Sequence, residues 1–133
     1  MPPDVVRAGL QQPTLWLSRD ASTMQLEGWQ QPDIDETQTT MRAVYNQLPS
    51  DGYLVLVPGM FHADFSDGPL LSPFAARLGI SGSLGAGRAH AIVDAYSVAF
   101  FDRHLRGQAA PLLDGSDPRF PEVLFAARPP PRR

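Results

Sequence analysis

Two short apolar runs predict β-strands. Residues 53–57 read Tyr-Leu-Val-Leu-Val, with no polar residue among them. A run of this kind suits a strand that is buried on both faces of a sheet. Pro58 and Gly59 end the run. Residues 14–17, Thr-Leu-Trp-Leu, follow Pro13 and are also rich in β-prone side chains, so we predict a second buried strand there.

Two other segments have the spacing of amphipathic helices. From 38 to 48, apolar residues recur at intervals of three and four, at Met41, Val44, Tyr45 and Leu48. This spacing predicts a helix over 38–48, with Asp35 or Thr37 as its N-cap. Residues 88–106 carry a broad apolar stripe and are followed by Gly107. They predict a longer helix that ends at a glycine cap.

The remaining segments carry turn-forming and polar residues. Residues 1–12 predict a leading segment with one helical turn, and residues 21–36 predict mostly loop with a single turn of helix. Residues 68–87 are rich in Gly, Pro and Ser and predict a long surface loop. Their glycines do not have the spacing of a phosphate-binding loop. Residues 108–126 predict irregular structure with an edge segment at 120–125.

The order strand, helix, strand, helix predicts an α/β fold. It corresponds to a right-handed βαβ unit of parallel strands, covered by a C-terminal helix. Two strands and two helices do not bury a parallel sheet on both faces. The strand at 14–17 also has one edge without a partner, which is a template for association. We therefore predict an incomplete sheet, as in a piece of a larger domain.

Composition narrows the classes of function. The chain of 133 residues has a net charge of −3 and a pI near 5.4, which gives no basic footprint for nucleic acid. It has no cysteine, so disulfides and thiolate chemistry are excluded. No apolar run is long enough for a membrane span, and the first residues lack the pattern of a signal peptide. We expect a soluble protein, cytoplasmic by default, or secreted if a signal precedes Met1.

His62 is the candidate for chemistry, because it follows the strand at 53–57 within a few residues. In open parallel sheets, functional side chains gather at the carboxyl ends of the strands, and an imidazole there is the usual base of a serine hydrolase. The nucleophile motif Gly-x-Ser-x-Gly is absent. Ser81 comes nearest to it, and Asp20 is a candidate acid after the first strand. The alternatives are that His62 is a loop histidine without a role and that Asp20 is a solvated loop carboxylate.

Other polar residues suggest weaker alternatives. The spacing His62-x-Asp64-x-x-Asp67 resembles part of a metal site, but nothing upstream completes it, and we predict no metal and no cofactor. We expect Asp64 and its neighbours to hold the loop after His62 through hydrogen bonds to the main chain. His90 and His104 fall in the first and last turns of the long helix, and we expect structural roles for them.

Four segments, at 12–17, 59–67, 96–107 and 112–123, resemble a known family, the α/β-hydrolases of the platelet-activating factor acetylhydrolase type and their dienelactone-hydrolase-like bacterial relatives. Residues 59–67, Gly-Met-Phe-His-Ala-Asp-Phe-Ser-Asp, resemble the signature around the catalytic histidine. Residues 12–17, Gln-Pro-Thr-Leu-Trp-Leu, resemble the preceding strand. Residues 96–107, with Ala-Phe-Phe-Asp-x-His-Leu-x-Gly, resemble the last helix, and residues 112–123 resemble the closing segment. The resemblance covers nearly the whole chain and about the last third of the family's domain.

The resemblance implies that His62 is the catalytic base and carries over no other member of the triad. The family's serine elbow, acid and oxyanion hole lie upstream of the residues present here. Many other α/β-hydrolases place the acid near the position of Ser22, and Asp20 is offset from it. A residual hydrolase that uses Ser81 or Ser22 as its nucleophile is a third, weaker interpretation.

The sequence therefore predicts a C-terminal segment of an α/β-hydrolase domain over 1–126 and a disordered Pro/Arg tail over 127–133. The parent would be a serine carboxylic-ester hydrolase that acts on a small short-chain or phospholipid-like ester, and the isolated chain would be inactive. The alternative is a non-enzymatic βαβ module completed as a homodimer through the exposed strand at 14–17.

Overall fold

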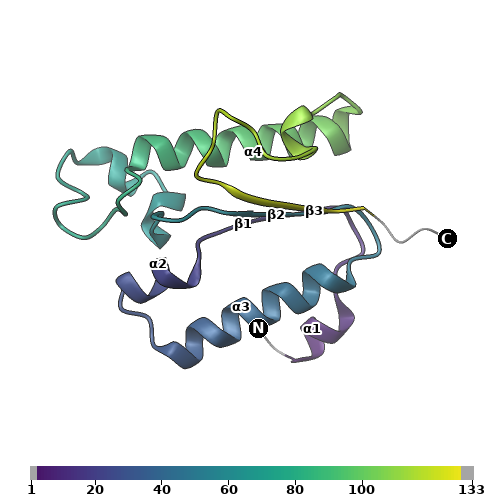
Figure 1. Cartoon of the computed structure of the whole chain (residues 1–133), viewed down its shortest axis with the longest axis horizontal. Helices are drawn as coiled ribbons and strands as arrows, with labels where there is room; N and C mark the ends of the chain where they lie inside the picture. The colour runs from purple at the N-terminus through teal and green to yellow at the C-terminus, as the bar shows by residue number, and fades with distance from the viewer. Residues whose placement is uncertain (1–2, 130–133) are drawn as a thin grey trace.

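A computed structural model describes residues 3–129 as a three-stranded sheet between two layers of helices (Figure 1). Its strands are β1 (Thr14–Ser18), β2 (Gly52–Leu56) and β3 (Leu124–Arg128). Its α-helices are α1 (Pro3–Ala8), α2 (Ala21–Leu26), α3 (Gln31–Gln47) and α4 (Ala86–Arg106). Three short 3-10 helices, η1 (His62–Phe65), η2 (Gly68–Leu71) and η3 (Pro111–Leu113), lie in the connections.

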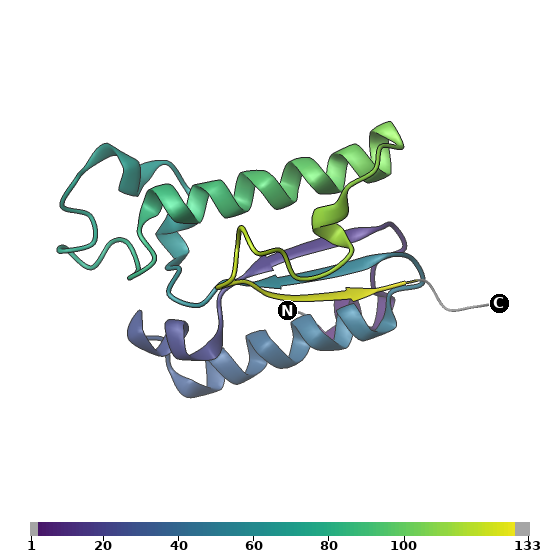
Figure 2. The ribbon, with the colours of Figure 1, turned by 45° about the horizontal axis from the view of Figure 1, so that its top comes forward.

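The sheet has the order β1-β2-β3, with β2 in the centre (Figure 2). β1 and β2 are parallel and pair Thr14 with Gly52 and Ser18 with Leu56. All five residues of β2 are buried, as the apolar run predicted. The helices α2 and α3 connect β1 to β2, so the βαβ unit expected from the sequence is present.

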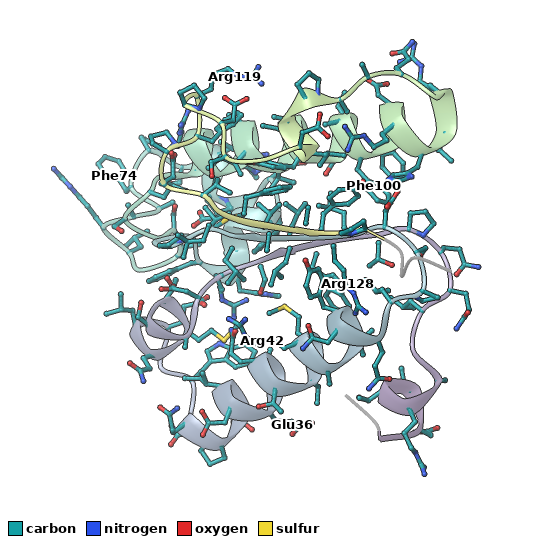
Figure 3. All side chains as sticks on the ribbon, turned by 45° about the vertical axis from the view of Figure 1, so that its right-hand side comes forward. Glu36, Arg42, Phe74, Phe100, Arg119 and Arg128 are labelled. Carbon is teal, nitrogen blue, oxygen red and sulfur yellow. The ribbon has the colours of Figure 1, made fainter. Side chains whose placement is uncertain are left out.

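The two faces of the sheet have separate cores. On one face, α4 packs through Ala89, Ile92 and Tyr96 against Val55, Val57 and Met60. Phe100, seen on the same face in Figure 3, adds an edge-to-face contact with Tyr53 at 6.0 Å between ring centroids. On the other face, Met41 of α3 packs against Leu54 and Leu56, with Trp16 and Tyr45 at the margin.

Three boundaries differ from those that the sequence predicts. The helix expected at 38–48 begins at Gln31, because Pro32 occupies its first turn, where a proline needs no N–H partner; neither Asp35 nor Thr37 is its cap. Part of the loop expected at 21–36 is the helix α2, which Asp20 caps. The third difference concerns the C-terminal segment.

β3 extends past the predicted domain boundary at 126 and is antiparallel to β2. Its Ala126 and Ala127 pair with Leu54 and Tyr53, and Arg128 donates a hydrogen bond to the carbonyl oxygen of Tyr45 at 3.0 Å. The predicted disordered tail therefore cannot begin at 127, and residues 130–133 lie outside the described part of the chain. The sheet is thus mixed, and β3 covers the edge of β2 that faces away from β1.

Within residues 3–129, β1 pairs with β2 alone, so it is left as an edge strand of the sheet. All of its residues are half-buried, and it carries the apolar side chains Leu15, Trp16 and Leu17. The open edge predicted from the sequence is therefore confirmed. None of the helices described between residues 3 and 129 is long and apolar enough to cross a membrane.

The long connection between β2 and α4 packs closely on the turn that follows β2. Gly82 lies against this turn, and a Cβ atom built on Gly82 would stand 2.1 Å from the carbonyl oxygen of Gly59. No real side chain tolerates that distance, so the contact requires glycine for steric reasons rather than for its dihedral angles.

We predict that Gly82→Ala destabilises the protein by about 1–3 kcal/mol, because the main chains at 59 and 82 must move apart. Gly87→Ala is the matched control, since this helical glycine has open space around its Cβ position and alanine favours a helix by about 1 kcal/mol. Urea unfolding of the two variants measures the difference. Equal free energies of unfolding for the two variants would contradict the contact.

Candidate active site around His62

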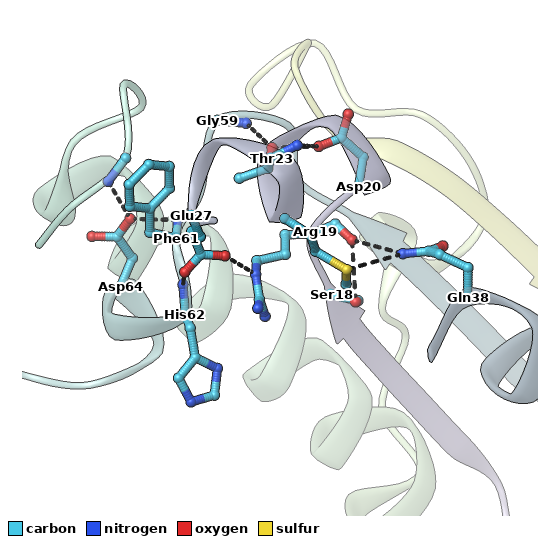
Figure 4. A network of polar contacts seen from close by, with 12 residues as sticks. Ser18, Arg19, Asp20, Thr23, Glu27, Gln38, Gly59, Phe61, His62 and Asp64 are labelled. Atoms are coloured by element: carbon cyan, nitrogen blue, oxygen red, sulfur yellow. Dashed lines mark hydrogen bonds and ion pairs between the residues drawn. The ribbon is translucent and has the colours of Figure 1, made fainter. Parts of the chain in front are cut away.

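His62 begins η1, just beyond the carboxyl end of β2, and its backbone N–H meets the side chain of Glu27, which directly follows α2 (Figure 4). The His62 side chain is exposed and borders a pocket of about 480 Å³, whose lining includes Leu26, Glu27, Phe61 and Ile80. No hydrogen bond joins its ring to any residue of the described chain. The imidazole is therefore accessible and its two nitrogens are uncommitted.

A buried carboxylate holds the loop that carries His62. Asp64 is fully buried. One of its oxygens accepts from the backbone N–H groups of Phe61 at 2.8 Å and Gly82 at 2.9 Å. The other accepts from the hydroxyl of Ser81 at 2.5 Å. Hydrogen bonds to a charged group contribute about 1.5–3 kcal/mol each, so the contacts of Asp64 stabilise the conformation of this loop. The role expected of Asp64 is confirmed.

Neither serine candidate is placed against the imidazole. Ser81 is 5% exposed and donates its hydroxyl proton to Asp64, so it has a structural partner in a buried setting. Ser22 is exposed at the start of α2 and donates to Asp20 at 2.7 Å. No hydrogen bond within residues 3–129 connects either hydroxyl to His62.

Asp20 has the position of an N-cap. Its carboxylate accepts from the backbone N–H of Thr23 at 3.1 Å and from the hydroxyls of Thr23 and Ser22. The Thr23 hydroxyl in turn accepts from the N–H of Gly59 at 3.0 Å. Asp20 therefore holds the turn before His62 through Thr23, and no hydrogen bond connects it to the imidazole. The candidate acid acts on the turn rather than on the ring.

The electrostatics of Asp20 follow from these contacts. Burial alone would raise the pKa of its carboxyl group, but the hydrogen bonds from Thr23 and Ser22 outweigh burial and lower the pKa below its ordinary value of 3.8. The ionised form is therefore the one that caps α2.

A third contact that holds the His62 loop comes from the residue directly after α2, and the sequence analysis did not predict it. Glu27 accepts the backbone N–H of His62 at 2.6 Å, and its second oxygen forms an ion pair with Nε of the buried Arg19 (Figure 4). Glu27 follows a helix in a region that the sequence analysis predicts to be mostly loop. No helical pattern in the sequence therefore indicated that Glu27 lies near His62. The Asp20-x-x-Thr23 spacing was the signal that could have located α2.

The other two histidines have structural contacts, as expected. Nε2 of His90 lies 2.9 Å from the carbonyl oxygen of Ser66. Nε2 of His104 lies 3.2 Å from the hydroxyl of Tyr53, and its ring packs on Phe100. The described residues contain no cluster of three or more His, Cys, Asp or Glu side chains that could hold a metal ion. A larger hollow of about 600 Å³ lies along α4, with Asp94, Val98 and Asp102 in its lining, and contains none of the three histidines.

The geometry thus leaves one side chain at this end of the sheet available for proton transfer. An exposed imidazole stands at the carboxyl end of a parallel strand pair, on a loop whose main-chain N–H groups at 59, 61 and 62 are each bound to a buried or half-buried side chain. Such an imidazole can take a proton from a nucleophile and return it to a leaving group. A nucleophile against the ring is not among the contacts of the described chain.

The fold is of the hydrolase-like α/β type. It resembles the structure of a ferulic acid esterase from Streptomyces cinnamoneus with a TM-score of 0.67 and 32% sequence identity, over 94% of this chain. The chain spans 36% of the length of that esterase. No protein-family model matches the chain, and comparison with curated proteins gives no match. The partial α/β-hydrolase fold expected from the sequence is therefore confirmed at this level.

We predict that the cap made by Asp20 contributes stability that is lost in acid. Because its pKa is lowered in the folded state, its contribution is present above the ordinary value of 3.8 and disappears as the pH falls through the lower folded value. Thermal unfolding of the protein and of Asp20→Asn between pH 7 and pH 2 tests this. The melting temperatures should differ at pH 7 and converge towards the acid end of the range, where the carboxyl group of Asp20 is protonated in both the folded and the unfolded state. A difference that is constant with pH would contradict the assignment.

Proposed function

We propose that the chain is the C-terminal part of a serine carboxylic-ester hydrolase and supplies its catalytic histidine, His62. The observation that carries the proposal is the exposed side chain of His62 beyond the carboxyl end of β2, on a backbone held by hydrogen bonds, in a chain whose fold resembles part of an esterase. In this reaction His62 takes the proton of a serine hydroxyl as the serine attacks the ester carbonyl. It then returns that proton to the leaving alcohol.

The extent of the match supports the same assignment. The chain covers about a third of the esterase that it resembles, and a serine elbow, an acid and an oxyanion hole would come from the remaining part. Residues 3–128, up to the end of β3, then belong to one hydrolase domain. We propose that the isolated chain is inactive, since a base without a nucleophile has nothing to activate.

The proposed substrate is a small carboxylic ester. The resemblance of residues 59–67 to platelet-activating factor acetylhydrolases favours a short-chain or phospholipid-like ester. The pocket beside His62, with Leu26, Phe61 and Ile80 in its lining, supports an ester with an apolar group. The matched relative is named for ferulic acid esters, so an aromatic ester is the natural comparison substrate.

A chimera tests the role of His62. We expect that the Streptomyces esterase, with its matching segment replaced by this chain, hydrolyses p-nitrophenyl acetate, and that His62→Asn lowers kcat by at least about 10³-fold because the serine loses its base. His90→Asn is the matched control, since its Nε2 atom has a structural partner in the backbone carbonyl oxygen of Ser66. Circular dichroism confirms that each chimera is folded.

A folded, active chimera whose kcat is unchanged by His62→Asn would contradict the proposal. The isolated chain should show neither hydrolysis nor labelling by a fluorophosphonate probe. A labelled serine at Ser81 or Ser22 would instead favour the residual hydrolase.

A second candidate is a non-enzymatic βαβ module that is complete as a homodimer. The observation in its favour is the open edge of β1, at residues 14–18, which has β2 as its single partner in the described part of the chain. Two such edges can pair across a twofold axis and cover the apolar strand.

Sedimentation velocity over a hundredfold range of concentration separates the two candidates. The hydrolase segment predicts a monomer, or poorly defined aggregates, because β1 awaits another part of the same domain. A dimer that persists at the lowest concentration and unfolds in one cooperative transition would favour the module and contradict the hydrolase assignment.

A further inference from the structure

Glu27 connects the buried side chain of Arg19 to the backbone of the exposed His62 at the carboxyl end of the sheet. One carboxylate oxygen accepts the N–H of His62 at 2.6 Å, and the other is paired with Nε of Arg19. Arg19 directly follows β1, Glu27 follows α2, and His62 begins η1. The carboxylate thus bridges the end of one strand to the loop that leaves the next, as Figure 4 shows.

The ion pair in this bridge is withdrawn from solvent. The side chains of Arg19 and Glu27 are 7% and 11% exposed. The Arg19 guanidinium also lies over the Trp29 ring, 4.8 Å from its centroid, and its Nη2 atom is buried without a partner in the described chain. In this setting the carboxylate of Glu27 is the counter-charge that Arg19 requires, so Glu27 has one fixed position and the N–H of His62 is bound to a fixed acceptor.

A second arginine–glutamate pair shows what is particular to this one. Arg88 and Glu122 are 38% and 23% exposed, and both oxygens of Glu122 face the same guanidinium. That pair joins α4 to the segment before β3, and Arg88 also donates to the backbone carbonyl oxygen of Arg119. Glu27, in contrast, divides its two oxygens between a buried cation and the main chain of His62.

We propose that Glu27, held by Arg19, is a positioning residue for His62. It acts through the main chain and leaves both ring nitrogens free for proton transfer. Together with Thr23 at Gly59 and Asp64 at Phe61, it fixes the backbone from which the imidazole projects. This inference rests on the proposed role of His62 as a base, but its main test reads position without turnover.

The test is amide hydrogen exchange by NMR on the 133-residue chain. Removing Glu27 alone leaves Arg19 buried and unpaired, which threatens the fold, so the main variant is Arg19→Met with Glu27→Leu. We expect the His62 amide to exchange at least about tenfold faster in this double variant, since its hydrogen bond is lost. Glu27→Gln keeps an acceptor oxygen but loses the ion pair, and we expect an intermediate rate.

Two controls isolate the effect. Thr23→Val removes the acceptor of the Gly59 amide and should accelerate exchange at Gly59 but not at His62. Glu122→Gln makes the same chemical change in the other ion pair and should leave both amides unchanged. An unchanged His62 rate in the double variant would overturn the proposal, and so would equal acceleration of all amides, which indicates only a general loss of stability.

A kinetic arm connects position to catalysis. In the active chimera, the double variant should lower kcat per fluorophosphonate-titrated site by roughly 10–100-fold, because a small misplacement of a catalytic group is costly, while KM is unchanged. A purely structural role would lower the number of titrated sites and leave kcat per site constant, which overturns the proposal. An inactive chimera with the expected exchange pattern would count against the proposed function and not against the positioning by Glu27.

Discussion

The placement of His62 depends on three hydrogen bonds to the main chain between residues 59 and 62. Thr23 accepts from Gly59, Asp64 accepts from Phe61, and Glu27 accepts from His62 itself. A loop of this kind does not have the regular backbone hydrogen bonds of a strand. Ordering each of its residues costs about 1–2 kcal/mol of backbone conformational entropy. Hydrogen bonds to buried carboxylates, at about 1.5–3 kcal/mol each, are strong enough to offset that cost. The imidazole is thereby held on a fixed backbone while its ring remains free to react.

The same three contacts explain why β1 and α2 belong to the site although neither carries the base. Arg19 and Asp20 stand directly after β1, and each reaches the histidine loop through one residue of the α2 segment, Glu27 in the first case and Thr23 in the second. The parallel pairing of β1 with β2 brings their carboxyl ends together, so the residues after one strand can support the loop after the other. In our proposal, one neighbouring part of the same hydrolase domain explains two features: it would pair with the open edge of β1 and would supply the nucleophile for His62.

The elements with strong local signals could be predicted from the sequence. The apolar run of β2, the stripe of α4 and the cap at Gly107, whose φ is 63°, are encoded by neighbouring residues. The role of Asp64 could also be expected, because one of its contacts is local. The antiparallel pairing of β3 could not be predicted, because apolar and polar side chains alternate only weakly over residues 124–128. These residues acquire their place by pairing with β2, in which Leu54 lies 72 positions before its partner Ala126. The hydrogen bond between Glu27 and His62 joins residues 35 positions apart. It depends on α2, whose polar composition gives no clear helical pattern in the sequence.

The central claim is that His62 is the general base for a nucleophilic serine of the same hydrolase. Its most direct test is fluorophosphonate labelling in the cells that express the native gene, followed by peptide sequencing of the labelled protein. The proposal predicts that the labelled serine lies in a Gly-x-Ser-x-Gly peptide of the polypeptide that also contains residues 59–67. Recovery of those residues only in an unlabelled protein of 14.5 kDa would contradict it.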